Sequence, residues 1–162
     1  MSTSRWFVVG LCSLGLAAGG VAWWVRFDAT RQSLEFWDPI GAQLLVEQAD
    51  LAVRDLPDGD WQELAQAKGL VHMQHFLALD RSFDWTVTPD PAATDWRWQF
   101  RLHKGERAAE FAVSGDCLAI GRVDKTGGFH RTVSCAPIAK SLTDYFTALG
   151  LIAPEKPADE AR

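Results

Sequence analysis

Residues 96–103 read WRWQFRLH, and residues 104–115 continue as KGERAAEFAVSG. Apolar and polar residues alternate along the first stretch, which is the period-two pattern of a strand with one buried face. The apolar positions of that strand are Trp96, Trp98, Phe100 and Leu102. The dipeptide Lys104-Gly105 supplies a two-residue turn of the kind that hairpins use. This region therefore predicts an antiparallel hairpin with a Trp-rich core face.

A turn at Lys104-Gly105 also predicts which residues of the hairpin face each other. The expected pairs are Trp96 with Val113, Trp98 with Phe111, and Phe100 with Ala109 on the apolar face, and Gln99 with Glu110 and Arg101 with Ala108 on the other. A second turn at Gly115-Asp116 predicts a third strand, with Leu118 opposite Val113 and Ile120 opposite Phe111. A fourth strand is expected from Phe129 to Cys135. Agreement of both faces in one register favours this arrangement.

Helices are predicted before and after these strands in the sequence. Asp38-Pro39 is a typical helix start, with Asp as the N-cap and Pro in the first turn. A short strand is expected near residues 50–56, and a capping box at Asp60 and Glu63 predicts a helical region to about residue 80. The last helix is expected from Pro137 to about residue 149. The fold class is therefore α+β, a small domain with an antiparallel meander of about four to five strands packed against helices.

The N-terminal region has a different composition from the rest. Residues 6–25 read WFVVGLCSLGLAAGGVAWWV and carry no charge. Twenty helical residues span roughly 30 Å, the thickness of a bilayer core, so a membrane-spanning helix is expected. A cleaved signal peptide is the alternative. The expected organisation is an anchor or signal peptide over residues 1–25, a juxtamembrane segment over 26–37, the α+β domain over 38–152 and a disordered tail over 153–162.

This apolar segment also predicts partners and a location. The lipid bilayer is the expected partner of residues 6–25. Gly15 and Gly19 form a GxxxG pattern, which favours close helix packing with a membrane-protein partner or a second copy, although an Ala- and Gly-rich stretch also produces this pattern by chance. A short N-terminal tail favours a single-pass membrane protein with its main domain outside the cytoplasm.

The charge of the chain argues against one class of partner. The sequence holds 16 basic and 21 acidic side chains, for a formal net charge of −5. Binding to nucleic acid depends on clustered Lys and Arg that displace counterions from phosphates. No such cluster occurs in this sequence, so a nucleic-acid partner is not expected.

Cys117 and Cys135 are a candidate disulfide pair. An odd-length turn centred on Thr126 would place them opposite each other. The hairpin pattern instead turns Cys117 outward, and bringing Val133 to the inner face requires a register shifted by one residue. Both arguments hold only if the strand pair contains a bulge. Two buried or half-buried thiols are favoured over a disulfide.

His72 and His75 are the candidate metal ligands. They lie three residues apart in a predicted helix, so both imidazoles can face one ion. A zinc site needs further ligands, and the sequence has no second HxxH and no CxxC or HExxH to supply them. The favoured interpretation is therefore two surface or boundary histidines, and no metal site is expected. No cofactor is expected, since no phosphate loop or dinucleotide fingerprint is present.

Three tryptophans outside the predicted span and strands are candidate anchors for a partner. Trp37, Trp61 and Trp85 each adjoin an aspartate at the boundary of a predicted element. Partly exposed tryptophans are enriched where protein partners bind most tightly. Trp37 can alternatively rest on lipid headgroups, and core burial is the favoured interpretation for Trp61 and Trp85.

These observations favour a non-catalytic accessory or protein-interaction subunit, held to a membrane by one helix. One alternative is a membrane-tethered metal-binding or enzymatic domain that uses His72 and His75. Another is a secreted ligand-binding module that follows a cleaved signal peptide. A ligand-binding module would use the sheet face opposite the core, where Arg97, Arg101 and His103 offer donors to an anion.

Overall fold

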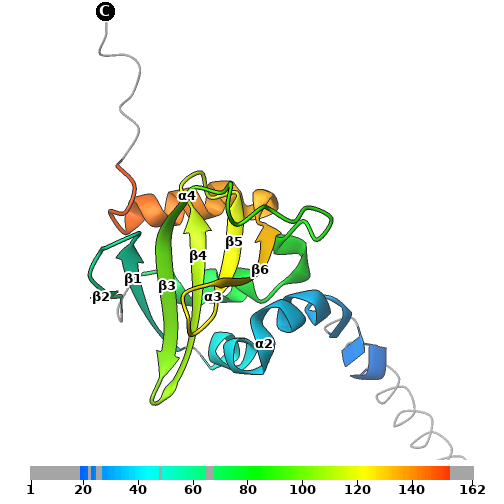
Figure 1. The fold of residues 1–162 in the computed structure, drawn as a ribbon. Coiled ribbons are helices and arrows are strands. Elements are labelled where there is room, and N and C mark those ends of the chain that lie inside the picture. Colours follow the sequence, from blue (N-terminus) through cyan, green and yellow to red (C-terminus); the bar gives the residue numbers. More distant parts are fainter. Residues whose placement is uncertain (1–18, 22, 25–26, 48, 65–67, 154–162) are drawn as a thin grey trace, which may run out of the picture.

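The computed structural model describes residues 19–21, 23–24, 27–47, 49–64 and 68–153. Within these residues the chain forms one six-stranded sheet in the order β2-β1-β3-β4-β5-β6, with antiparallel pairing between all neighbours (Figure 1). The strands are β1 (Asp50–Asp55), β2 (Gln62–Glu63), β3 (Trp96–Lys104), β4 (Arg107–Ser114), β5 (Ala119–Val123) and β6 (Phe129–Ser134). The α+β class with an antiparallel sheet is confirmed.

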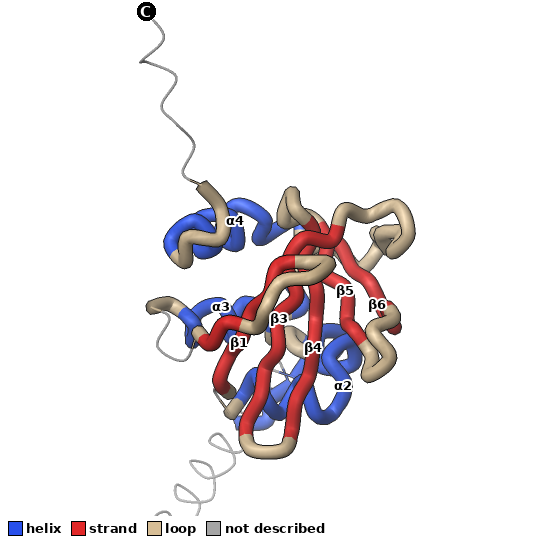
Figure 2. The backbone as a smooth tube through the Cα atoms, turned by 60° about the vertical axis from the view of Figure 1, so that its left-hand side comes forward, coloured by secondary structure: helices blue, strands red, loops and turns tan. Residues whose placement is uncertain are grey.

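Three helices pack on one face of this sheet. They are α2 (Arg31–Val46), α3 (Leu70–Leu77) and α4 (Ala139–Ala148), with 3-10 turns η1 (Asp80–Ser82) and η2 (Ala136–Ile138). Phe146 of α4 stacks on Phe100 of β3 at 5.2 Å between ring centroids, and Trp37 of α2 meets Phe111 of β4 edge-on at 5.1 Å. Figure 2 shows the other face of the sheet free of helices.

The core face of the β3–β4 hairpin is as predicted for Trp98, Phe100 and Leu102, but the predicted register is wrong. Phe100 lies opposite Phe111 rather than Ala109, and Leu102 lies opposite Ala109. The turn is centred on Gly105-Glu106, one residue later than expected, with Gly105 at φ 60°. A hairpin turn of this kind takes glycine at its first central position. Moving the turn by one residue changes each partner by two positions, so the faces are preserved.

The β4–β5 register is also shifted by two positions from the prediction. Val113 lies opposite Ile120, and Leu118 precedes the strand with 45% of its surface exposed. The prediction that Leu118 faces the core is therefore wrong. The connection is longer than a two-residue turn because Cys117 adopts φ 58° and its N–H donates to the Ser114 carbonyl at 2.9 Å.

Trp96 does not lie on the core face, which corrects a further expectation. The β3–β4 pairing slips between Trp96 and Trp98, so Trp96 lies opposite Ser114 while Trp98 lies opposite Val113. A bulge of this kind turns the following side chains to the opposite face. Trp96 consequently stacks on Phe129 of β6 across the uncovered face, at 4.4 Å between ring centroids.

A second slip, between Arg122 and Val123, brings β6 into the register that its core residues require. Val123 lies opposite Phe129, while Ile120 lies opposite Val133. The sequence argument required a register shifted by one residue to turn Val133 inward, and the pairing of Ile120 with Val133 has that register. Val133 is 3% exposed.

The predicted capping box at Asp60 and Glu63 is wrong. Gln62 and Glu63 form β2 and pair with Val53 and Ala52 of β1. The spacing of a capping box is a local pattern and does not show whether a neighbouring strand can pair with the same residues. Here the free edge of β1 pairs with Gln62 and Glu63. The sheet therefore has six strands instead of four to five.

The predicted cap at Asp38 is confirmed within a longer helix. Asp38 has φ 60° and interrupts α2, so the helical segment before it and the segment after it meet at a kink. Its Oδ1 accepts hydrogen bonds from the N–H groups of Ile40 and Gly41, both at 2.9 Å. The last helix also follows the prediction, with Leu142 and Phe146 buried and Gly150 at φ 76° beyond its end.

The prediction of a membrane-spanning helix over residues 6–25 is corrected. Among the described residues, no helix is both long enough and apolar enough to cross a membrane. The helical residues of this region are 19–21, 23–24 and 27–28, and a turn follows at Ala29 and Thr30. Residues 6–18, 22 and 25 of the predicted span lie outside the described residues.

Candidate binding cleft beside the edge strand

A cleft of about 500 Å³ runs beside β6, the last strand of the sheet. Its walls come from the first half of α2, the segment 85–91 and β6. The lining residues are Gln32, Glu35, Trp85, Val87, Thr88, Pro91, Phe129, His130, Arg131, Thr132 and Val133. This volume lies within the range of about 300–1,000 Å³ that is typical of ligand pockets.

Trp85 forms an aromatic wall of the cleft, and its position is fixed by contacts with residues outside the cleft lining. Its indole N–H donates to the Asp80 carbonyl at 2.9 Å. Its ring packs against Phe83 at 5.1 Å and Phe36 at 6.1 Å between centroids. Trp85 is half-buried, so the core holds one part of the indole while another part remains available to the cleft.

Phe129 forms the second aromatic wall. Its ring stacks on Trp96, and the Trp96 indole N–H donates to the Pro91 carbonyl at 2.9 Å. Gly121 lies beneath this stack, where an added Cβ would come within 2.6 Å of Phe129 and 2.9 Å of Trp96. The lack of a side chain at Gly121 is what lets the two rings lie flat against the sheet.

The segment between the two aromatic walls is joined to the end of β6 by a single antiparallel bridge, between Asp84 and Ser134. Ser134 accepts a hydrogen bond from the Asp84 N–H at 2.8 Å and donates its own N–H to Val87 at 3.3 Å. Further along, the Thr132 hydroxyl donates to the Pro89 carbonyl at 2.7 Å. Proline has no N–H, so strand-like pairing cannot continue through Pro89. An edge that ends in prolines is protected against indiscriminate pairing.

Two hydrogen bonds to one carboxylate fix the α2 side of the cleft. The Asp80 side chain accepts from the N–H of Ser33 at 2.7 Å and from the N–H of Gln32 at 3.0 Å. These N–H groups are at the helix start, where no carbonyl of the helix can satisfy them. Asp80 therefore ties the position of Gln32 and Glu35 to η1, next to Trp85.

Arg131 is the main cationic group of the cleft. Its guanidinium donates to the Glu35 carbonyl at 3.2 Å and to the Glu35 carboxylate at 3.4 Å. Both side chains are well exposed, at 46% and 67%. An exposed ion pair contributes little free energy, in the range of about 0–1 kcal/mol. Arg131 can therefore exchange this partner for an anionic group of a ligand at low cost.

Asp84 sits at the start of the loop that closes the cleft. Its carboxylate accepts hydrogen bonds from the Thr86 hydroxyl at 2.6 Å and from the Thr86 N–H at 3.0 Å, and these bonds lower the pKa of Asp84 below its ordinary value. The Asp84 carboxylate thus stabilises the turn at Trp85 and Thr86. The cleft as a whole offers two aromatic surfaces, one guanidinium and one neighbouring imidazole, His130, on a preformed frame.

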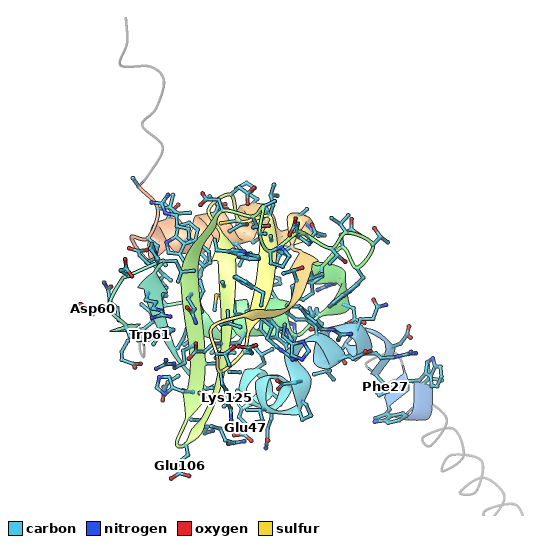
Figure 3. The ribbon with its side chains drawn as sticks, viewed as in Figure 1. Phe27, Glu47, Asp60, Trp61, Glu106 and Lys125 are labelled. Atoms are coloured by element: carbon cyan, nitrogen blue, oxygen red, sulfur yellow. The ribbon has the colours of Figure 1, made fainter. Side chains whose placement is uncertain are left out.

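The three candidate tryptophan anchors have different environments. Trp37 is 1% exposed and belongs to the core, so it offers no surface to a partner or a headgroup. Trp61 is half-buried, with the guanidinium carbons of Arg101 and Arg54 at 4.1 Å and 4.8 Å from its ring centroid (Figure 3). Only Trp85 lines a cleft.

The polar residues of the uncovered face already contact one another. Arg101 bonds to Glu110 at 2.7 Å, and His103 lies 3.1 Å from Glu63. The Gln99 side chain joins Arg54 to Glu110 and is 4% exposed. An anion would have to displace these partners from Arg101 and His103. The cleft beside β6 is consequently the better candidate site.

His72 and His75 both lie on the exposed side of α3. In the described ranges no group of three or more His, Cys, Asp or Glu side chains is arranged to hold a metal ion. His75 borders the groove between α2 and α3, and His72 borders a small apolar cavity of about 150 Å³ between α3 and α4.

Cys117 and Cys135 are free, buried thiols in the structure. The Cys135 thiol donates to the Cys117 carbonyl at 3.0 Å. Burial raises the pKa of Cys135 to about 12 and also raises the pKa of Cys117. A thiol that stays protonated is a poor nucleophile, so this pair acts as core packing. Of the glycine pair proposed for helix packing, Gly19 has open space around it and Gly15 lies outside the described residues.

Sequence reasoning missed Phe129 and Arg131 as site residues. Both were assigned to an ordinary strand, and no motif spacing distinguishes them. The prolines at 89 and 91 are the one local signal, because two prolines in a loop mark a segment that cannot join a sheet in full. Compared with known proteins, this chain matches no family model, no curated protein and no solved structure.

Proposed function

We propose that this protein is a non-catalytic interaction subunit whose α+β domain binds a segment of a partner protein in the cleft beside β6. The observation that carries the proposal is the arrangement of Trp85, Phe129 and Arg131 around a preformed cleft of about 500 Å³. Trp, Tyr and Arg are the residues most enriched where partners contribute most binding energy.

The preformed shape of the cleft supports a role in binding a partner segment. The aromatic walls are held by contacts with residues outside the cleft lining, such as the Trp85 indole to Asp80 and the Phe129 ring to Trp96. A preformed site loses less conformational entropy when a partner binds. The mixed aromatic and cationic lining suits a peptide segment with an apolar side chain and a carboxylate.

Site-specific photocrosslinking tests this proposal. A photoreactive residue at Thr88, on the cleft loop, should give discrete adducts with a protein partner in native extract. The same residue at Lys140, which is exposed on α4, is the matched control and should give none. Arg131→Glu in the Thr88 background should reduce the adducts by about tenfold, as a lost charged contact implies. Equal adducts at both positions, or none at Thr88, would contradict the proposal.

The location of the domain outside the cytoplasm stays a prediction from the N-terminal sequence. Protease accessibility of the full chain in intact and permeabilised cells would test it. Cleavage only after permeabilisation would contradict it.

A further inference from the structure

A second apolar groove lies on the helical side of the domain, away from the proposed cleft. It has a volume of about 520 Å³ and runs between α2 and α3. Its lining is mainly aliphatic, from Ala29, Leu34, Leu45, Val46, Val71, Ala78 and Leu79. Val46 and Val71 on its rim are 70% and 52% exposed. A groove with such an exposed apolar rim is a candidate interaction surface.

The chain also carries an exposed aromatic stripe of matching character. Trp23, Trp24 and Phe27 are 67%, 65% and 47% exposed. They lie on the helical residues that precede α2, at positions that fall on one side of a helix. Trp23 and Phe27 stack at 5.6 Å between ring centroids with an interplanar angle of 15°, so their side chains form one preformed knob.

This knob does not occupy the groove of its own chain. Phe27 is separated by a single residue from Ala29, which lines the groove, and a turn at Ala29 and Thr30 directs the helical residues away from the domain (Figure 3). Both Trp23 and Phe27 remain largely exposed as a result. An aromatic knob that is too close in sequence to reach its own groove can reach the groove of another copy.

We infer that two copies of this protein associate by placing the Trp23–Phe27 knob of each in the α2–α3 groove of the other. Two such contacts related by a two-fold axis make a closed, self-complementary interface. Trp23, Trp24 and Phe27 are 67%, 65% and 47% exposed, so these side chains can bury roughly 540–900 Å² over the two copies before the groove walls are counted. Groove walls that lose a similar area bring the total to roughly 1,100–1,800 Å², which overlaps the about 1,200–2,000 Å² that specific interfaces bury.

Sedimentation velocity of the purified full chain over a range of concentrations tests the inference. The unaltered protein should form dimers. The knob variant Trp23→Glu/Phe27→Glu and the groove variant Val46→Glu/Val71→Glu should each raise the dimer dissociation constant by about 100-fold or more, as expected for buried aromatic contacts. Leu118→Glu is the matched control, because Leu118 is a similarly exposed apolar residue in the β4–β5 turn, and it should leave the dimer unchanged.

Mixing the two variants shows whether dimers are lost because the knob–groove contact is broken or because each variant simply has less apolar surface. The groove of the knob variant and the knob of the groove variant remain intact, so an equimolar mixture should recover heterodimers through one of the two contacts. If the groove variant fails to fold by circular dichroism, the knob variant alone decides, since its residues are exposed.

Three results would overturn the inference. The first is an unaltered protein that stays monomeric at about 100 µM, well above the dissociation constants of typical specific complexes. The second is a dimer that survives both variants. The third is a monomer whose binding to phosphatidylcholine vesicles depends on the knob but not on the groove, which would assign the stripe to a lipid surface.

Discussion

The indole N–H of Trp37 in α2 donates a hydrogen bond to the main-chain carbonyl of Leu77 in α3, at 2.7 Å. The Ser33 hydroxyl donates to the same carbonyl at 2.8 Å. Carbonyls in the last turn of a helix have no partner within the helix. Two side chains of α2 therefore complete the end of α3, in a place where all three residues are buried.

A double-mutant cycle on Ser33 and Trp37 should show strong coupling. Ser33→Ala or Trp37→Phe leaves the Leu77 carbonyl with one donor, so each should lower the free energy of unfolding by about 1–2 kcal/mol. The double variant leaves the buried carbonyl without a donor and should cost about 1 kcal/mol more than the sum. Urea unfolding measures this. Trp61→Phe, at a half-buried site without such a bond, is the control, and additive losses would contradict the prediction.

Gly121→Ala should destabilise the domain because the new methyl group meets the Phe129 and Trp96 rings at 2.6 Å and 2.9 Å. Displacing the stacked pair should cost about 1–3 kcal/mol, the range for overpacked sites. Thermal unfolding checks this value. Gly20→Ala is the control, because nothing lies within 4 Å of its added Cβ, and it should change stability by less than about 1 kcal/mol. An equal effect of the two changes would be evidence against the close packing at Gly121.

The same change should weaken the proposed cleft. Phe129 forms one wall, and Trp96 holds Pro91 in place. In the crosslinking assay, Gly121→Ala should therefore reduce the Thr88 adducts at a temperature where the domain remains folded. If the variant is destabilised but the amount of adduct is unchanged, partner binding in the cleft does not depend on the aromatic stack.

Asp38→Ala and Asp38→Asn should differ in stability. Asp38 caps the second half of α2 through Oδ1 and adopts φ 60° and ψ 174°, a backbone conformation that is strained for any side chain. Alanine should lower the free energy of unfolding by about 1–2 kcal/mol, because it removes the cap hydrogen bonds. Asparagine keeps an oxygen acceptor and should stay within about 1 kcal/mol of the original. Chemical unfolding of both variants checks the difference, and equal losses would argue against the cap.

The Cys135 thiol should be protected from thiol reagents in the folded protein. Burial holds its pKa at about 12, against 9.0 for an ordinary cysteine, so very little thiolate exists at pH 8. In a Cys12→Ser background, modification by Ellman's reagent at pH 8 should be at least about 100-fold slower in the native protein than in urea. Similar rates in the two states would contradict the buried environment.

The same shift predicts how stability depends on pH. The pKa of Cys135 is higher in the folded than in the unfolded state, so its contribution to stability is complete below about pH 9 and is lost as the pH rises toward about 12. Replacing the thiol by Cys135→Ala should therefore reduce the loss of stability between pH 9 and pH 11. A pH dependence that this variant leaves unchanged would assign the loss to other groups.

The alternation along residues 96–103 and 107–114 was enough to predict a hairpin, its core residues from Trp98 to Leu102, and the α+β class. Such a pattern is local, because successive side chains of any strand point to opposite faces. The cap at Asp38 and the stop at Gly150 are local for the same reason, since each acts on the backbone within three residues.

The register, the bulges and the cleft depend on residues that are far apart in the chain. A turn one residue later moves every partner by two positions without changing the apolar pattern, so Phe100 faces Phe111 in the fold although the pattern also permits Ala109. Trp96 leaves the core because a bulge intervenes, and it then meets Phe129, 33 positions along the printed sequence. A local sequence pattern covers too few residues to relate Trp96 to Phe129.

The sequence by itself determined which faces of the hairpin and of the last helix are apolar, and where the kinked helix is capped. Only the tertiary structure decided that Phe129, Trp85 and Arg131 share a cleft, that Trp37 is core, and that the aromatic stripe of Trp23 and Phe27 lies outside the domain. The reason is physical. Faces and caps follow from bonds along the chain, whereas clefts form where segments that are distant in sequence leave space between them.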